Sequence, residues 1–175
     1  MISLSLPALA GILGAAADGL PEIDFSAVTI DSRQSCTGKL FVAIKGPNFD
    51  GHRFVDAAYR NGAVAALVEQ RQQSDIVQIE VADCKQALAQ LANHWRHSCD
   101  PCVVALTGSN GKTTVKEMLH QILGREASAL ATRGNLNNDI GVPLTLFELE
   151  QDHQFAIVEM GANHRGEIAN LASIA

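Results

Sequence analysis

The spacing of apolar residues divides the first half of the chain into short helices and strands. Four apolar residues near the start recur at helical spacing: Leu6, Leu9, Ala10 and Leu13. With Ser5 as N-cap and Pro7 in the first turn, they predict a short helix. Four further segments predict strands: residues 25–30, 40–44, 63–68 and 76–81. Two apolar sets predict helices after residue 51 and from about residue 85: Phe54, Val55, Ala58 and Tyr59, then Leu88, Leu91, Ala92 and Trp95.

A second series of elements begins after a polar break at residues 98–101. Five mostly apolar residues from Val103 predict a buried strand. The apolar positions of a following helix recur at helical spacing: Val115, Met118, Leu119, Ile122 and Leu123. A short strand at residues 128–131, a polar loop leading into a helix that runs through Leu146, and an apolar strand at residues 155–158 complete the series. Alternating strands and helices predict a doubly wound parallel α/β sheet. Because a new α/β unit starts after the polar break, we divide the chain into two domains, residues 1–98 and residues 99–175.

The segment between the strand and the helix is typical of a phosphate-binding loop. It contains two glycines, Gly108 and Gly111, and continues into Lys112 and Thr113. Backbone N–H groups of such a loop and the positive end of the helix dipole converge on one anion. Lys112 could reach the outer phosphates, and the Thr113 hydroxyl could ligate Mg²⁺. Leu106 stands where the common pattern has its first glycine, but the agreement of all the other features favours a phosphate site over a plain turn.

A carboxylate is expected at the same edge of the predicted sheet. Glu159 directly follows the apolar strand at residues 155–158, and ligands of parallel sheets bind at the carboxyl ends of the strands. Mg²⁺ prefers oxygen ligands and is often held by one or two protein groups together with phosphates. We therefore predict a metal site made by Thr113 and Glu159, and the alternative is a solvated acid at the end of a strand.

The charge and hydropathy of the chain narrow the range of functions. The net charge is −6, with 13 basic and 19 acidic residues, so binding to nucleic acid regardless of sequence is not expected. No apolar run is long enough to span a bilayer. The apolar N-terminal segment has no basic residue before Arg33, unlike a signal peptide, and the scattered cysteines suggest no disulfide framework. We expect a cytoplasmic protein without membrane insertion, and a monomer.

Three segments of the second half carry a resemblance to a known family. They are residues 107–114 (Thr-Gly-Ser-Asn-Gly-Lys-Thr-Thr), 134–143 (Gly-Asn-Leu-Asn-Asn-Asp-Ile-Gly-Val-Pro) and 158–168 (Val-Glu-Met-Gly-Ala-Asn-His-Arg-Gly-Glu-Ile). Together they resemble the Mur ligases, and the first is also shared with folylpolyglutamate synthetases. The second and third are similar to the members that add D-alanyl-D-alanine. In the first half, residues 29–33, 40–46 and 50–52 resemble the domain that holds the UDP part of the substrate.

The resemblance implies an ATP-dependent amide ligase of peptidoglycan precursor synthesis. Such an enzyme phosphorylates the terminal carboxylate of a UDP-N-acetylmuramoyl-tripeptide, and the amine of D-alanyl-D-alanine then attacks the acyl phosphate. The implied cofactors are ATP and Mg²⁺, with Lys112 and Glu159 as catalytic residues and Thr113 and Glu159 as metal ligands. The implied ATP-binding residues are Gly108, Ser109, Asn110, Gly111, Lys112, Thr113 and Thr114. The implied substrate contacts are Ser32 and Arg33 for UDP, and Asn137 and Asn138 beside the reacting groups.

One departure from the family pattern bears on activity. Family members have three domains, whereas this chain stops at Ala175, inside the central one. We therefore expect an N-terminal fragment, with a small α/β substrate domain and a truncated P-loop-containing parallel-sheet ATPase domain, that does not complete ligation alone. Two alternatives stay open: another Mur-type or folylpolyglutamate ligase, and a non-catalytic nucleotide-binding module.

Overall fold

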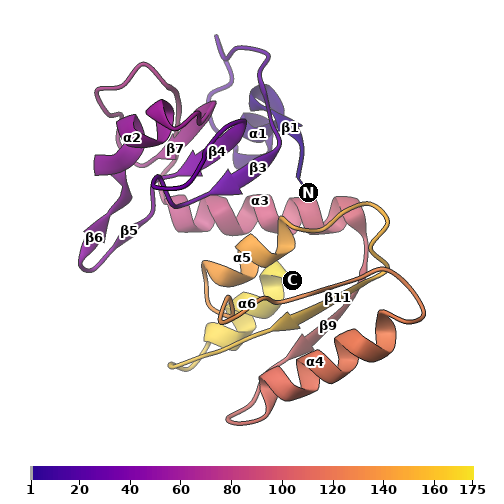
Figure 1. Cartoon of the computed structure of the whole chain (residues 1–175). Coiled ribbons are helices and arrows are strands. Elements are labelled where there is room, and N and C mark those ends of the chain that lie inside the picture. Colours follow the sequence, from indigo (N-terminus) through magenta and orange to yellow (C-terminus); the bar gives the residue numbers. More distant parts are fainter. Residues whose placement is uncertain (1) are drawn as a thin grey trace. The chain divides into compact units, whose positions relative to one another are not determined.

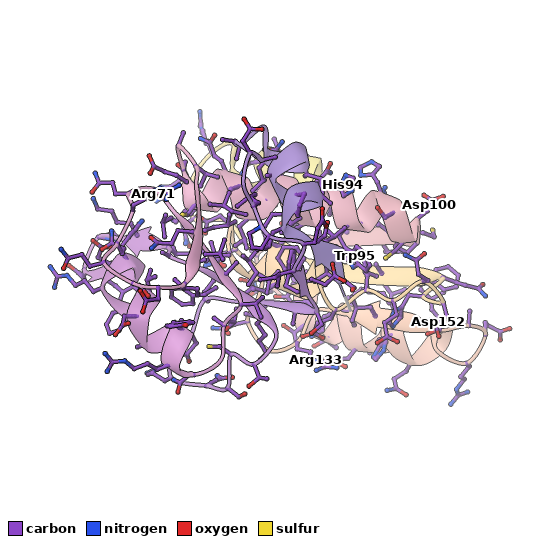
Figure 2. The ribbon with its side chains drawn as sticks, turned by 90° about the horizontal axis from the view of Figure 1, so that it is seen from above. Arg71, His94, Trp95, Asp100, Arg133 and Asp152 are labelled. Atoms are coloured by element: carbon purple, nitrogen blue, oxygen red, sulfur yellow. The ribbon has the colours of Figure 1, made fainter. Side chains whose placement is uncertain are left out.

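A computed structural model describes residues 2–175, which form two compact units (Figure 1). The first unit ends at Leu91 and the second begins at Ala92, so the division lies inside helix α3 (Cys84–Cys99). The sequence boundary at residue 98 lies instead near the end of that helix. The last turns of α3 belong to the second unit, where the indole Nε1 of Trp95, labelled in Figure 2, donates to the Leu149 carbonyl at 3.2 Å.

A four-stranded parallel sheet forms the centre of the first unit. Its strand order is β3 (Ala27–Thr29), β4 (Lys39–Val42), β7 (Ala65–Val68) and β8 (Val77–Glu80). Two antiparallel pairs accompany it: β1 (Leu4–Ser5) with β2 (Asp24–Phe25), and β5 (Lys45–Gly46) with β6 (Phe49–Asp50). The predicted strand at 25–30 is thus two strands. It divides because Phe25 pairs with Leu4, whereas Ser26 donates its N–H to the Gly38 carbonyl beside β4.

The helices of this unit lie in the chain where the apolar spacing predicts them. Helix α1 (Leu6–Leu13) has Ser5 as N-cap, whose hydroxyl accepts from the Ala8 N–H, and it ends at Gly14. A 3₁₀ turn η1 (Gly51–Phe54) leads into α2 (Val55–Arg60), and α3 follows β8. The apolar cluster beneath α2 consists of Cys36, Phe41, Ala43, Val55, Ala58, Ala63, Ala66, Val68 and Ile76.

The second unit is a three-stranded parallel sheet with helices. Its elements, in chain order, are β9 (Cys102–Leu106), α4 (Lys112–Leu123), β10 (Ala129–Ala131), α5 (Gly141–Leu146), β11 (Phe155–Glu159) and α6 (Glu167–Ile174). The strand order is β10, β11, β9, and both pairs are parallel. Helix α4 packs on β11 and β10 (Figure 1). The prediction of a parallel α/β fold is confirmed.

One prediction about burial in this unit is wrong. The strand from Val103 was expected to be buried, but β9 lies at the edge of the sheet, and Cys102 and Ala105 are exposed. On α4, Val115 and Met118, which belong to the helically spaced apolar set, are 45% and 59% exposed. The residue of α4 that is buried against the sheet is Lys116. Among residues 2–175, no helix is both long and apolar enough to cross a membrane.

Candidate functional site

The loop between β9 and α4 has a backbone that only glycine adopts readily. Gly108 has a φ of 148° and Gly111 a φ of 77°, both in the region that L side chains rarely occupy. Gly111 is the N-cap residue of α4, and its carbonyl accepts from the Val115 N–H at 2.9 Å. The two glycines therefore turn the chain from strand to helix within a few residues. This turn leaves the first N–H groups of a twelve-residue helix at the end of β9.

A cavity of about 520 Å³ borders this loop. Its lining residues come from the segments that follow all three strands of the sheet: Thr107, Gly108, Ser109, Lys112, Asn137, Asn138, Gly161, Ala162 and Asn163. The carboxyl ends of parallel strands meet at one edge, and this is why segments so distant in the chain share one cavity. Of the predicted site residues in this unit, Asn110, Gly111, Thr113, Thr114 and Glu159 do not line it.

Glu159 lies at the end of β11, almost completely buried. Only 3% of its surface is exposed, which contradicts the alternative of a solvated acid. Its Oε2 accepts a hydrogen bond from the Thr113 hydroxyl at 2.9 Å, and its Oε1 accepts from Asn137 Nδ2 at 3.0 Å. Three predicted site residues from α4, the polar loop and β11 are therefore in direct contact.

Lys112 lies beside the cavity but is turned toward its own loop. Its ammonium Nζ donates to the Gly108 carbonyl at 2.7 Å. The side chain is only partly buried. A phosphate group in the cavity would offer this ammonium a charged acceptor in place of a neutral carbonyl, and charged hydrogen bonds are the stronger kind.

Sequence reasoning missed several residues that complete the site. Thr107, Gly161, Ala162 and Asn163 line the cavity without having been predicted as ligand contacts. The position of Thr107 and Gly161 just after a strand was a usable signal. Gly161 also donates its N–H to the Asn137 carbonyl at 2.8 Å, and an added Cβ there would lie only 3.0 Å from Asn137 Cγ. The glycine therefore allows the Asn137 loop to pack closely against β11.

The oxygen atoms at this site fit Mg²⁺ in kind. A hydroxyl and a carboxylate 2.9 Å apart are hard oxygen ligands, the type that this ion prefers. Within residues 2–175, no three His, Cys, Asp or Glu side chains gather into a metal site. If the ion binds here, Thr113 and Glu159 are the residues that would hold it, together with phosphate oxygens and water.

Comparison with known proteins shows which family this chain resembles. The model of the Mur ligase family catalytic domain matches residues 24–96, and the model of the Mur ligase middle domain matches residues 106–175. The chain belongs to the Mur ligase family. The resemblance inferred from the sequence is thus confirmed.

Named relatives are similar over nearly the whole chain. The UDP-N-acetylmuramoyl-tripeptide–D-alanyl-D-alanine ligase of Escherichia coli (strain K12) is 47% identical over 174 residues, which are 99% of this chain and 38% of that protein. The Haemophilus influenzae ligase of the same name is 46% identical over 96% of this chain and 38% of its own length. The chain therefore spans about two-fifths of the curated relatives it matches.

Solved structures of Mur ligases share the fold. MurF from Acinetobacter baumannii superposes with a TM-score of 0.94 at 43% identity, covering 99% of this chain and 39% of that one. The MurF ligase of Thermotoga maritima, solved in complex with ADP, gives a TM-score of 0.78 at 38% identity over 85% of this chain and 35% of its own.

The predicted UDP contacts of this Mur ligase chain lie in the first unit. The Arg33 side chain is 86% exposed, and its guanidinium donates to both carboxylate oxygens of Asp31, at 2.8 and 2.9 Å. This pairing holds the pKa of Asp31 well below its usual range. Ser32 is 7% exposed, and its carbonyl accepts from Asn61 Nδ2. Arg33 is therefore at the surface, whereas Ser32 lies mostly within the unit.

Proposed function

We propose that this chain forms the substrate domain and the first part of the ATP-binding domain of a ligase. The ligase joins D-alanyl-D-alanine to a UDP-N-acetylmuramoyl-tripeptide, using ATP and Mg²⁺, as a monomeric cytoplasmic enzyme. The observation that carries the proposal is the buried Glu159 carboxylate, bonded to Thr113 and Asn137 beside a cavity that the phosphate-type loop borders. We take the identity of the two substrates from the names of the relatives.

Each residue then has a role that follows from its position. The loop N–H groups and Lys112 hold the phosphates of ATP, because they present positive charge at the end of β9. Thr113 and Glu159 hold Mg²⁺, which neutralises phosphate charge and orients the transferred group. Asn137 fixes Glu159 through its hydrogen bond, and Asn138, which lines the same cavity, faces the reacting groups. In the first unit, Ser32 and Arg33 contribute to binding of UDP.

The proposed reaction has two steps. An oxygen of the terminal tripeptide carboxylate attacks the γ-phosphorus, and the bond between that phosphorus and the bridging oxygen breaks to release ADP. The amine of D-alanyl-D-alanine then attacks the acyl carbon, loses a proton and expels phosphate to leave an amide. Phosphoryl transfer needs mainly positioning and charge neutralisation, which the residues around Glu159 could supply.

The test measures ADP release by the full-length protein that carries this sequence, with the UDP-muramoyl-tripeptide and several acceptor amines. ADP release should depend on D-alanyl-D-alanine and should be absent with single amino acids. Lys112→Ala should abolish ATP use but leave binding of the UDP substrate nearly unchanged, because Lys112 acts on the phosphates. Glu159→Gln should abolish Mg²⁺-dependent turnover.

Three results would count against the proposal. Release of ADP driven by a single amino acid would point to another Mur-type ligase, and failure to bind the UDP-muramoyl-tripeptide would point to a general nucleotide-binding module. Full turnover by Glu159→Gln would remove Glu159 as the metal ligand. The 175-residue chain alone should release no ADP in response to D-alanyl-D-alanine.

A further inference from the structure

The residue of α4 that is buried is a lysine. Lys116 is 2% exposed, whereas Val115, Met118 and Ile122 on the same helix are 45%, 59% and 61% exposed. An ammonium group is costly to bury unless it is paired and hydrogen-bonded. A leucine or methionine would pack against the sheet without that cost. The partners of Lys116 therefore indicate why a charged side chain occupies this position.

Lys116 makes one contact toward solvent and one toward the interior. Its Nζ lies 2.9 Å from Oε1 of Glu117, a residue whose side chain is 57% exposed. The same Nζ donates to the main-chain carbonyl of Thr132 at 2.6 Å. The first contact balances the charge. The second ties α4 to the residue that directly follows β10.

Thr132 carries this connection to Glu159. It is 1% exposed, and its N–H donates to the Ile157 carbonyl at 3.0 Å. Its hydroxyl oxygen accepts from the main-chain N–H of Glu159 at 2.9 Å. Lys116 therefore fixes Thr132, and Thr132 holds the end of β11 at two points.

Helix α4 thus reaches Glu159 by two routes. Thr113 bonds the carboxylate directly, and Lys116, one turn further along the helix, holds the Glu159 main chain through Thr132. Mg²⁺ requires near-ideal octahedral geometry at short distances, so a small shift of one oxygen ligand weakens binding. A carboxylate held at both its main chain and its side chain is suited to that requirement.

We propose that Lys116 is a positioning residue that sets the Glu159 carboxylate for Mg²⁺, acting through Thr132. The proposal rests on the proposed function for the identity of the metal-bound nucleotide. It predicts that loss of the Lys116 donor weakens the metal dependence of nucleotide binding and leaves the loop's own contact with phosphate intact.

The experiment titrates ADP into the full-length protein by calorimetry across a range of Mg²⁺ concentrations. Lys116→Met keeps an unbranched side chain only one atom shorter and removes the donor, and Thr132→Val removes the hydroxyl. Each should raise the Mg²⁺ concentration for half-maximal ADP binding by about tenfold, as is typical when support of a metal ligand is lost. ADP binding without Mg²⁺ should not change.

Three comparisons separate positioning from a general loss of structure. Thr132→Ser should recover most of what Thr132→Val loses, because it restores the oxygen that accepts from Glu159. The double variant should be no worse than either single one, because both act on one connection. Met118→Ala is the matched control on α4, because 59% of the Met118 surface is exposed, and it should leave the Mg²⁺ requirement unchanged.

An unchanged Mg²⁺ requirement in Lys116→Met would overturn the proposal, as would additive effects in the double variant. A lower unfolding temperature with an unchanged Mg²⁺ requirement would show a purely structural lysine. If Lys116→Met does not fold, the Thr132→Val and Thr132→Ser pair decides. ADP binding needs no acceptor, so a wild-type protein that binds Mg²⁺ and ADP but does not use D-alanyl-D-alanine would overturn only the proposed function.

Discussion

A single methyl group at Gly161 should disturb the candidate site without changing any ligand. A Cβ at this position would lie 3.0, 3.1 and 3.2 Å from Cγ, Oδ1 and Nδ2 of Asn137. The φ of Gly161 is outside the left-handed region, so alanine fits the backbone. The methyl group therefore acts only by pushing on the Asn137 side chain, whose amide donates to Glu159.

The size of this effect follows from the distances. Ordinary contact begins near 3.4 Å, so a Cγ that starts 3.0 Å away must move by about 0.4 Å. A shift along the bond would stretch the 3.0 Å contact between Asn137 Nδ2 and Glu159 Oε1 to about 3.4 Å, beyond the usual range. Hydrogen bonds to charged groups contribute about 1.5–3 kcal/mol, and losing half of one costs about 1 kcal/mol. Since 1.4 kcal/mol is tenfold, we expect Mg²⁺-dependent ADP affinity to fall about fivefold.

The assay is the titration of ADP with and without Mg²⁺, applied to Gly161→Ala in the full-length protein. The matched control is Gly11→Ala, because a Cβ at Gly11 has no atom within 4 Å. Affinity in Mg²⁺ that is unchanged by Gly161→Ala would refute the reasoning, since Asn137 would then not be holding Glu159 in a way that matters to the metal. An equal fall in affinity with and without Mg²⁺ would also refute it.

Three further outcomes can be measured on the 175-residue chain. Gly11→Ala should stabilise the chain by about 0.5–1 kcal/mol in denaturant unfolding, because Gly11 is inside α1 and alanine favours helix; a loss of stability would contradict the open space there. Iodoacetamide at pH 8 should label Cys102, which is exposed, and spare Cys84, where burial raises the thiol pKa to about 12; labelling of Cys84 in native protein, read by mass spectrometry, would contradict this. The Glu167 carboxylate accepts from the Asn163 and His164 N–H groups, which lowers its pKa, so the stability it adds is present above its unfolded pKa of about 4.3 and is lost as pH falls. Glu167→Gln should therefore lower the unfolding temperature at pH 7 and have little effect at pH 3, and an equal effect at both values would contradict the assignment.

The segments that form the candidate site could be predicted from the sequence, because each has a strong local signal. A strand, two glycines and Lys-Thr before an amphipathic helix indicate a phosphate loop, and both glycines have the positive φ that such a loop requires. Glu159 could be placed because an apolar strand in a parallel sheet ends at the ligand edge. The hydrogen bond from Asn137 to Glu159 could not be predicted, because Asn and Gly clusters mostly form turns, and only the fold brings the two residues together.

The burial of α4 shows where periodicity stops being informative. Helical spacing groups Val115, Met118 and Ile122 on one face, but it does not say which face meets the sheet. The structure places Lys116 against β10 instead, because Thr132 and Glu117 offer acceptors for its ammonium. A pattern of apolar residues contains no information about such acceptors, so a buried lysine is read from sequence as an exposed one.

The residue at which α4 starts determines whether Thr113 and Lys116 can reach the segments around Glu159. Thr113 and Lys116 are three residues apart, so they share a face of the helix and both reach the segments around Glu159. The phase of that face is set by where the first turn begins, which is Gly111 with its φ of 77°. A residue with a side chain would be strained in that conformation, and a helix that began one residue later would rotate both contacts away from β10 and β11 by about 100°. The loop would thus serve two purposes, since the glycine that leaves the helix N–H groups at the proposed phosphate site also fixes the direction in which Thr113 and Lys116 point.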